Sequence, residues 1–431
     1  MRREYQAPFH DFFTLLTPFR INGRTYYKKD CNEIELHKIL CGEVMRQNFI
    51  LCGLCTICSL LLSLGCGKDH KQKEPVILGA IYNLSGAQAG LDIPSSQGAQ
   101  LAVDEANQGS GLLGREVQLI LEDGETIPKV IAAKTAELLG AYPSMSALMG
   151  LSDTDMVLAA APVAAQNQRL FLTSGATSPK LPAQVPEYLF LACFGDNVQA
   201  AAAAEWAYNE LPARTVSVLF NISDTYTQLL QQYFRARFTQ LGGQILSVEG
   251  YTADNIGEPI GRLVNADLIF LSAGPDDAPQ AVELLRQAGF TSPIMGGDGF
   301  DSPDLWQQHP SVSNVFFTTH VYLGSDNPSP LVKAFREKYL QAYPNSRPDA
   351  FAALGYDTVR LLMAAITRAQ STDPSLVLKA LGETQQFQGV TGNISYTNGG
   401  HIPTKSVSIL RLEQGDFKLV KEFLPSEVPP P

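Results

Sequence analysis

Three glycines, Gly109, Gly111 and Gly114, have the G-x-G-x-x-G spacing that can hold the pyrophosphate of a dinucleotide. That chemistry requires the glycines to follow a strand and to begin a helix, whose N-terminus then faces the phosphates. Here they follow the helical pattern of residues 95–107 and precede the strand pattern of residues 116–121. The order of elements therefore predicts a connecting loop and not a nucleotide site.

Residues that commonly catalyse reactions are scarce beyond residue 75. His309, His320 and His401 have no other His or Cys at the spacing of metal ligands, and no nucleophile lies in a G-x-S-x-G turn. Cys193 lies in an apolar context that is typical of a small buried hydrophobe. We therefore expect this protein not to be an enzyme and to use no metal and no cofactor.

Polar segments follow the apolar runs that we predict to be strands. From residue 74 onward, short runs rich in Val, Ile and Leu alternate with segments of helical period, beginning with 76–82 and 95–107. This alternation predicts parallel sheets with helices on both faces, and such sheets bind ligands beyond the carboxyl ends of their strands. Segments rich in Gly, Ser, Thr and Asp lie at those ends: 83–93, 150–155, 173–180, 221–226, 272–277 and 296–301.

The length and composition fit an α/β protein with two lobes. The chain has 431 residues, of which 45% are hydrophobic and 17% are charged. The repeats are too many for one sheet, so we expect two doubly wound parallel-sheet lobes. The net charge of -11 disfavours a nucleic-acid partner, because phosphate binding needs concentrated Lys and Arg.

The C-terminal part of the chain has a different pattern. Residues 390–396, 406–412 and 417–423 have the pattern of short strands joined by turns, which predicts a small antiparallel addition. The end of the chain, 426–431, finishes in three prolines, and we expect it to be disordered.

An uncharged apolar run at 49–65 has the features of an export signal. It follows a basic residue and ends at Cys66, although its length borders on that of a transmembrane anchor. A cysteine at this break, followed by a polar tether at 67–74, resembles a bacterial lipoprotein signal, in which the cysteine is lipidated. Ser63 departs from that pattern, which usually has Leu three residues before the cysteine. We predict a lipoprotein-type signal at 45–66.

Residues 1–44 do not fit the start of an export signal. They contain acidic residues and no apolar run. We interpret 1–44 as an extension that precedes the true start of translation at Met45, and we assign no function to it.

Five short segments occur together in an order and spacing that indicate a family. They are Tyr82-Asn-Leu-Ser-Gly86, Gly98-Ala-Gln-Leu-Ala-Val-Asp-Glu-Ala-Asn107, Gly175-Ala-Thr-Ser-Pro-Lys-Leu181, Met295-Gly-Gly-Asp-Gly299 and Ala353-Leu-Gly-Tyr-Asp357. With them, about residues 75–420 resemble the type I periplasmic binding proteins of the leucine/isoleucine/valine-binding group, which serve ABC importers. The resemblance implies two lobes joined by three hinge crossings, with the ligand in the cleft. It implies a first lobe of 75–194 and 323–385, and a second of 195–322 and 386–425.

The resemblance also implies which residues hold the ligand carboxylate. In this family a hydroxyl and backbone N–H groups of the first lobe bind it, and the local match places Thr154, Gly175 and Thr177 there. Hydroxyls and N–H groups at helix N-termini favour a negative charge. The same threonines could instead act only as helix N-caps.

For the ligand ammonium, the resemblance implies Asp298, which lies in a Met-Gly-x-acid-Gly turn where Glu is common. Asp196 matches a second acid near the first crossing, and Tyr226 matches a tyrosine that covers the ligand. Phe351 would line the apolar end of the site. Leu91 stands where many members have a further aromatic residue, which argues against strict leucine-type specificity.

The resemblance finally implies partners and a location. The ligand would be a small molecule, an amino acid or a close analogue, and the protein partner would be an ABC transporter permease. The lipid on Cys66 would hold the protein on the periplasmic or extracellular face of the cytoplasmic membrane. Two alternatives stay open: the same fold binding a 2-oxo acid, an amide or urea, or an envelope lipoprotein that senses a ligand or binds proteins. Asp196 and Asp298 disfavour a purely anionic ligand, which they would repel.

Overall fold

A computed structural model describes residues 17–21, 24–28, 73–397 and 399–431. The chain divides into two compact units, Met1–Lys71 and Gln72–Pro431. In the first unit, strands β1 (Thr17–Ile21) and β2 (Arg24–Lys28) pair in antiparallel fashion. The predicted signal and its lipidation site, Cys66, lie outside the described residues.

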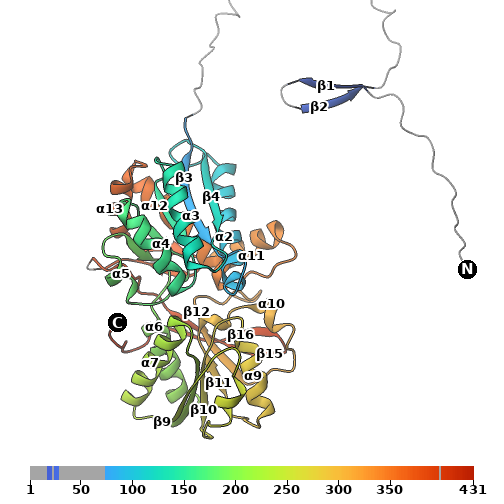
Figure 1. Ribbon diagram of the computed structural model, residues 1–431, viewed down its shortest axis with the longest axis vertical. Coiled ribbons are helices and arrows are strands. Elements are labelled where there is room, and N and C mark those ends of the chain that lie inside the picture. The colour runs from blue at the N-terminus through green and yellow to red at the C-terminus, as the bar shows by residue number, and fades with distance from the viewer. Residues whose placement is uncertain (1–16, 22–23, 29–72, 398) are drawn as a thin grey trace, which may run out of the picture. The chain divides into compact units, whose positions relative to one another are not determined.

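The first lobe of the larger unit, which contains β3, β4 and α2 in Figure 1, is built on a five-stranded parallel sheet with the order β4-β3-β5-β6-β7. Its strands are β3 (Val76–Tyr82), β4 (Val117–Asp123), β5 (Ala147–Gly150), β6 (Phe171–Thr173) and β7 (Leu189–Leu191). One face is covered by α2 (Ala89–Gln108), α11 (Pro330–Ala342), α12 (Ala350–Ala369) and α13 (Pro374–Gly382). The other face is covered by α3 (Pro128–Ala141), α4 (Thr154–Gln166) and α5 (Leu181–Gln184).

Strand β3 shows why this part of the sequence is an unbroken apolar run. Leu78 and Ala80 pack into the core beneath α2 and α12, whereas Ile81 packs into the core beneath α3 and α4. Because successive side chains of a strand point to opposite faces, a strand covered on both faces needs apolar residues at almost every position.

The second lobe has a seven-stranded mixed sheet with the order β16-β15-β12-β11-β10-β8-β9. The strands β8 (Thr215–Asn221), β9 (Gln244–Tyr251), β10 (Leu268–Ser272), β11 (Ile294–Gly296) and β12 (Val315–Thr319) are parallel. On one face lie α6 (Asp196–Asn209) and α7 (Thr225–Gln240), and on the other α8 (Gly257–Ile260), α9 (Ala278–Gln287) and α10 (Pro303–Trp306). The predicted fold class, two doubly wound α/β lobes, is confirmed.

The predicted antiparallel addition is divided between the two lobes. Strands β15 (Val407–Glu413) and β16 (Asp416–Phe423) extend the second sheet in antiparallel fashion. The first of the three predicted strands is instead a separate hairpin of β13 (Phe387–Gly389) and β14 (Gly392–Ile394). This hairpin belongs to the first lobe, because the buried carboxylate of Asp357 on α12 accepts hydrogen bonds from its turn.

The chain crosses between the lobes three times, as the resemblance implied. The crossings lie between β7 and β8, between β12 and α11, and between β14 and β15. The third crossing therefore comes after the hairpin and not at residue 386, where the expected boundary lay. Local sequence patterns do not reveal this, because the hairpin is joined to the first lobe by contacts with distant residues, such as the 2.8 Å hydrogen bond from Tyr396 Oη to Leu191 O.

The C-terminal segment 426–431 differs from the expectation of disorder. The Ser426 amide donates to the carboxylate of Glu205 on α6 at 2.9–3.0 Å, and Glu427 pairs with Arg237 of α7 at 3.0 Å. Glu205 and Arg237 are themselves a buried ion pair at 2.6 Å. The tail satisfies charged groups that the two helices bury, which is a tertiary role that its proline-rich composition does not reveal.

Helices α2 and α12 approach closely because glycines face each other's backbone. A Cβ atom added to Gly98 would lie 1.9 Å from Ala352 O, and one added to Gly355 would lie 1.9 Å from Ser95 O. Helix α12 is long and apolar enough to cross a bilayer, but 78% of it is buried, so it is the core helix of the first lobe. Helix α2 begins at Ala89, earlier than the pattern predicted, and contains Pro94.

Lys405, which lies in the third crossing, gives a testable pH dependence. Its ammonium is buried, donating to Thr391 Oγ1 at 2.5 Å and Ala192 O at 3.2 Å, and burial lowers its pKa to about 8 despite the nearby charge of Asp357. An unfolded Lys titrates near pH 10.4, so between those pH values the unfolded chain binds more protons, and stability should rise with pH. We expect Lys405 to raise the free energy of unfolding by about 2–3 kcal/mol as the pH increases through this range. The Lys405→Met variant should lack this rise. Urea unfolding of both proteins at pH 7.5, 9 and 10.5 checks this, and parallel curves would contradict it.

Candidate functional site

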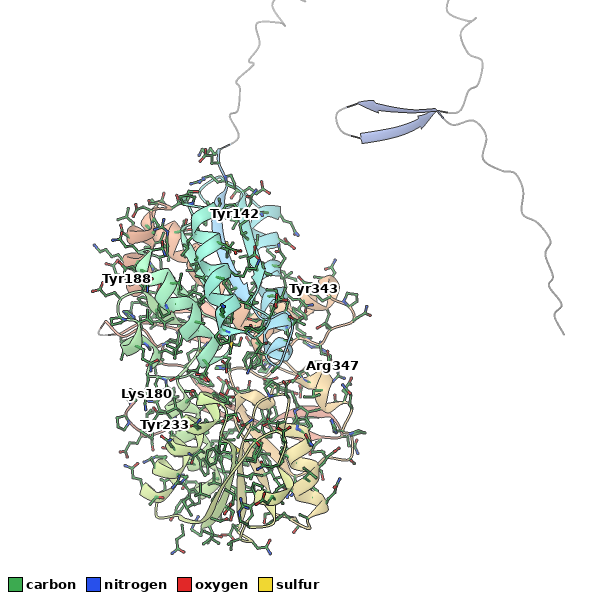
Figure 2. The ribbon with its side chains drawn as sticks, in the orientation of Figure 1. Tyr142, Lys180, Tyr188, Tyr233, Tyr343 and Arg347 are labelled. Carbon is green, nitrogen blue, oxygen red and sulfur yellow. The ribbon has the colours of Figure 1, made fainter. Side chains whose placement is uncertain are left out.

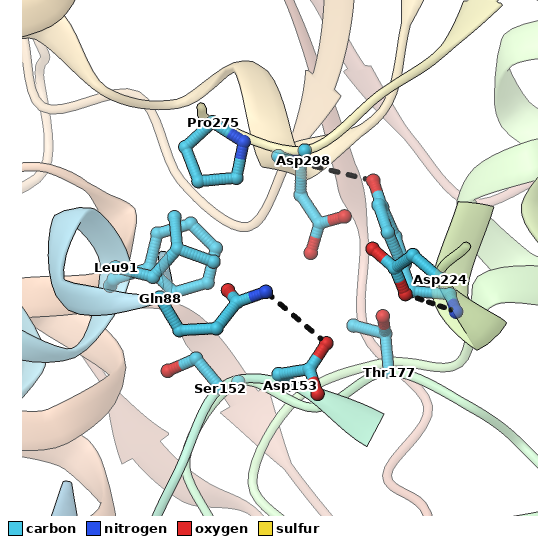
Figure 3. A pocket seen from close by; sticks show the side chains of 13 residues that line it. Gln88, Leu91, Ser152, Asp153, Thr177, Asp224, Pro275 and Asp298 are labelled. Carbon is cyan, nitrogen blue, oxygen red and sulfur yellow. Dashed lines mark hydrogen bonds between the residues drawn. The ribbon is translucent and has the colours of Figure 1, made fainter. Parts of the chain in front are cut away.

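A pocket lies at the carboxyl ends of the strands, between the two lobes (Figure 3). It contains about 300 Å³ of empty space when the open space at its mouth is counted. Six segments that follow predicted strands contribute two lining residues each, and Phe351 at the start of α12 completes the lining. The lining residues are Gln88, Leu91, Ser152, Asp153, Gly175, Thr177, Asp224, Tyr226, Gly274, Pro275, Asp298, Gly299 and Phe351.

The first-lobe side of the pocket presents hydrogen-bond donors. The Thr177 side chain points into the pocket (Figure 3), and the Ser152 hydroxyl is buried without a partner. Gly175 lies between them, where a Cβ atom would come within 2.9 Å of Ser152 Oγ and 3.0 Å of the Phe351 ring. The loop is fixed by Thr173, whose hydroxyl donates to Leu151 O at 2.8 Å and accepts from the Ala176 amide at 3.2 Å. Hydroxyls and a close backbone of this kind suit a carboxylate.

Thr154 is not among the residues that line this pocket. It is the first residue of α4, its hydroxyl is buried without a partner, and the helix is capped by Asp153, which accepts from the Met156 amide at 3.0 Å. In this loop the lining residues are Ser152 and Asp153. The polar segment 150–155 predicted the loop but could not show which side chains turn inward.

Asp298 is the central acid of the second-lobe side. It begins the turn η1 (Asp298–Phe300) after β11, it is buried, and its carboxylate points into the pocket (Figure 3). Gln199 Nε2 donates to Oδ1 at 2.7 Å, and the Asp298 amide donates back to Gln199 Oε1 at 3.1 Å. His320 Nε2 lies 3.0 Å from Oδ2. Each carboxylate oxygen keeps a lone pair for a ligand.

Gln199 and His320 are partners of Asp298 that sequence reasoning missed. Burial lowers the pKa of His320, so at neutral pH its ring is uncharged and binds Asp298 by a hydrogen bond and not as an ion pair. The ring stacks on Phe194 with centroids 3.9 Å apart. An isolated histidine and a glutamine within α6 carry no local signal of this role, since only the fold brings them to residue 298.

Asp196 and Tyr226 are both joined by hydrogen bonds to residues that contact or adjoin this acid. Asp196 is fully buried and does not line the pocket, but its Oδ1 accepts from Gln199 Nε2 at 3.0 Å. Burial and the charge of Asp298 raise its pKa well above the usual range. Tyr226 lines the pocket wall, and its hydroxyl accepts from the Gly299 amide at 3.2 Å. Asp196 therefore does not touch a ligand in this pocket, and it can influence one only indirectly, by way of Gln199 and Asp298.

Leu91 and Phe351 form the apolar wall. Both are buried in the first lobe and both line the pocket. Leu91 lies in the first turn of α2, which starts at Ala89 and so precedes Pro94. An apolar wall beside hydroxyl groups of the same lobe, with a buried acid on the other lobe, suits a small zwitterion with an aliphatic stem.

Two doubly wound lobes, three crossings and a pocket between the lobes define a two-lobed solute-binding protein. The chain belongs to the periplasmic binding protein family, whose model matches residues 75–416. This confirms the resemblance on which the predicted lobes and site rested.

Known proteins of this family are similar along most of their length. The Leu/Ile/Val-binding protein homolog 3 of Brucella melitensis is 24% identical over 79% of this chain and 92% of its own. The structure of LivJ of Streptococcus pneumoniae in complex with isoleucine is 25% identical, with a TM-score of 0.75 over 81% of this chain and 100% of its own. The leucine-binding protein LivK of Thermotoga maritima is 29% identical, with a TM-score of 0.73 over 81% and 99%.

Proposed function

We propose that this protein is the extracytoplasmic solute-binding component of an ABC importer and captures an amino acid by closing its two lobes. The observation that carries the proposal is the division of the pocket lining between the lobes. The hydroxyl residues Ser152 and Thr177 and the close backbone at Gly175 come from the first lobe, and a buried carboxylate, Asp298, comes from the second. An α-carboxylate and an α-ammonium are complementary to these two sides.

Closure follows from the same division. A ligand bound to the first lobe reaches Asp298 only when the lobes meet, so it stabilises the closed form by its differential affinity. The lobes already touch beside the pocket, where Thr225 Oγ1 of the second lobe donates to Asp155 Oδ1 of the first at 2.7 Å. Micromolar binding corresponds to about 8 kcal/mol, which a few charge-assisted hydrogen bonds and burial in a closed cleft can supply.

The proposed partners follow from the family. An importer of this kind needs a permease that receives the ligand, and lipidation of Cys66 would keep the protein at the membrane where that permease lies. In this proposal the protein captures its ligand and does not catalyse a reaction. The two lobes are the moving bodies: one contains residues 75–194, the other contains residues 195–322, and C-terminal segments return to complete each of them.

A thermal shift measurement tests the proposal. We expect one or a few amino acids at 1 mM to raise the Tm of the purified protein by several degrees, because a ligand at 1,000 times its Kd stabilises by about 4 kcal/mol. Mass spectrometry of the small molecule that remains bound through purification should identify the same compound. If only 2-oxo acids, amides or urea raise the Tm, the amino-acid assignment is wrong, although the binding-protein fold stands.

A further inference from the structure

Carboxylates from both lobes gather at the opening of the pocket. Asp153 of the first lobe and Asp224 of the second line the pocket that contains Asp298, and Figure 3 shows them beside it. Both also line an adjoining pocket of about 750 Å³, whose other acidic residues are Asp155, Asp276 and Asp277. The two pockets share Gln88, Asp153, Asp224, Gly274 and Pro275, so they adjoin each other in the cleft between the lobes.

No basic side chain balances these acids. In the part of the chain that the structure describes, none of the residues lining either pocket is Lys, Arg or His. Lys180 and Arg347 lie at opposite edges of the boundary between the lobes (Figure 2), and each lines a different pocket. Burial and the charge of Asp153 together raise the pKa of Asp224 to about 7, so the two carboxylates disfavour each other's charged form in this arrangement.

Helix capping explains only part of this arrangement. Asp153 caps α4 and Asp224 caps α7, accepting from the Tyr226 amide at 2.8 Å. Asn, Ser or Thr would also cap these helices and would not repel each other when the lobes meet. The helices therefore do not by themselves require a carboxylate at both positions.

The carboxylate of Asp277 has one oxygen that lacks a hydrogen-bond donor. Its Oδ2 accepts from Asn221 Nδ2 and from Tyr251 Oη, both at 2.8 Å. Its other oxygen, Oδ1, is buried without a hydrogen-bond partner. Asp277 is one of the residues that line the adjoining pocket, and only 6% of it is exposed. A buried carboxylate oxygen without a donor is costly, so a donor is expected from a ligand. In the described residues no three metal-ligating side chains converge, which favours an organic cation over a metal ion.

We propose that the ligand is an amino acid whose side chain ends in an ammonium or guanidinium group, which lies between Asp153 and Asp224 and extends toward Asp277. This inference rests on the proposed function, because it places the α-carboxylate and α-ammonium at Thr177 and Asp298. The aliphatic stem of such a side chain runs along Leu91 and Phe351, and only its end reaches the acids.

Pairs of ligands of equal shape test the inference. Titration calorimetry of the full chain should show arginine binding at least tenfold more tightly than citrulline, or lysine at least tenfold more tightly than norleucine. If no amino acid binds, the proposed function fails and this inference with it. If leucine, norleucine or citrulline binds as tightly as the cationic ligands, the proposed function stands and this inference is overturned.

Charge-removing variants that keep the helix caps locate the effect. Asp224→Asn and Asp153→Asn should each weaken binding of the cationic ligand about tenfold, whereas binding of its neutral counterpart should change less than about threefold. Asp373→Asn is the matched control, because Asp373 also caps a helix, α13, but lies outside both pockets. Equal losses for charged and neutral ligands in the Asp224 variant would overturn the assignment.

Discussion

Replacing Asp298 with asparagine is expected to weaken amino-acid binding roughly 100- to 3,000-fold while leaving the fold intact. Removing one partner of a buried charged pair costs about 3–5 kcal/mol, which gives that loss in Kd. The substitution keeps the size of the side chain and one acceptor for Gln199, and His320 can change tautomer to accept from the new amide. Calorimetric Kd values together with the Tm of the free protein separate lost binding from lost stability.

The neighbouring Asp301 provides a control within the same turn. It is also buried, it accepts from Thr319 Oγ1, and it does not line the pocket. Burial raises its pKa to about 7, so Asn closely resembles its protonated form. We expect Asp301→Asn to change the Kd less than about threefold. Unchanged binding in the Asp298 variant would remove this residue from the ammonium site.

The second large effect is expected on stability, from the Gly355→Ala substitution. The added Cβ would lie 1.9 Å from Ser95 O, so α2 and α12 must separate. Overpacking commonly costs about 1–3 kcal/mol, and a backbone oxygen cannot rotate away as a side chain can. We expect a loss of about 3 kcal/mol and a fall in Tm of roughly 5 °C or more, measured by urea and thermal unfolding.

Gly140→Ala is the opposite case on the same lobe. Gly140 lies at the exposed end of α3, and no atom lies within 4 Å of its added Cβ. Alanine loses less backbone entropy than glycine when a helix forms, so this variant should be more stable by roughly 0.5–1 kcal/mol. If both variants lose stability equally, close packing of α2 against α12 is not the reason for Gly355.

Much of the site could be predicted because one rule decides where it lies. In parallel α/β sheets the segments after the strands meet at one edge, and those six segments contain every lining residue except Phe351. Which side chains of a loop line the pocket depends on the backbone conformation of each residue, which the sequence pattern does not reveal. Segment 150–155 therefore predicted the loop, while in the structure Ser152 and Asp153, and not Thr154, line the pocket.

The features that could not be predicted depend on contacts between distant residues. His320 reaches Asp298 from the second crossing, and Gln199 reaches it from α6, where neither has a sequence pattern of its own. The C-terminal tail is held by Glu205, more than 200 residues earlier in the chain. Local periodicity describes an element but not the partner that holds it in place.

The three crossings also determine when the chain can fold. The first lobe needs α12, which begins at residue 350, after all the parallel strands of the second lobe have been made. The second sheet is complete only with β16, which ends at residue 423. Domains often fold one after another as the N-terminal part emerges during synthesis, but that order is not open to this protein. Both lobes remain incomplete until almost the whole chain has been synthesised. A product truncated before residue 387 would lack the β13–β14 hairpin of the first lobe and strands β15 and β16 of the second.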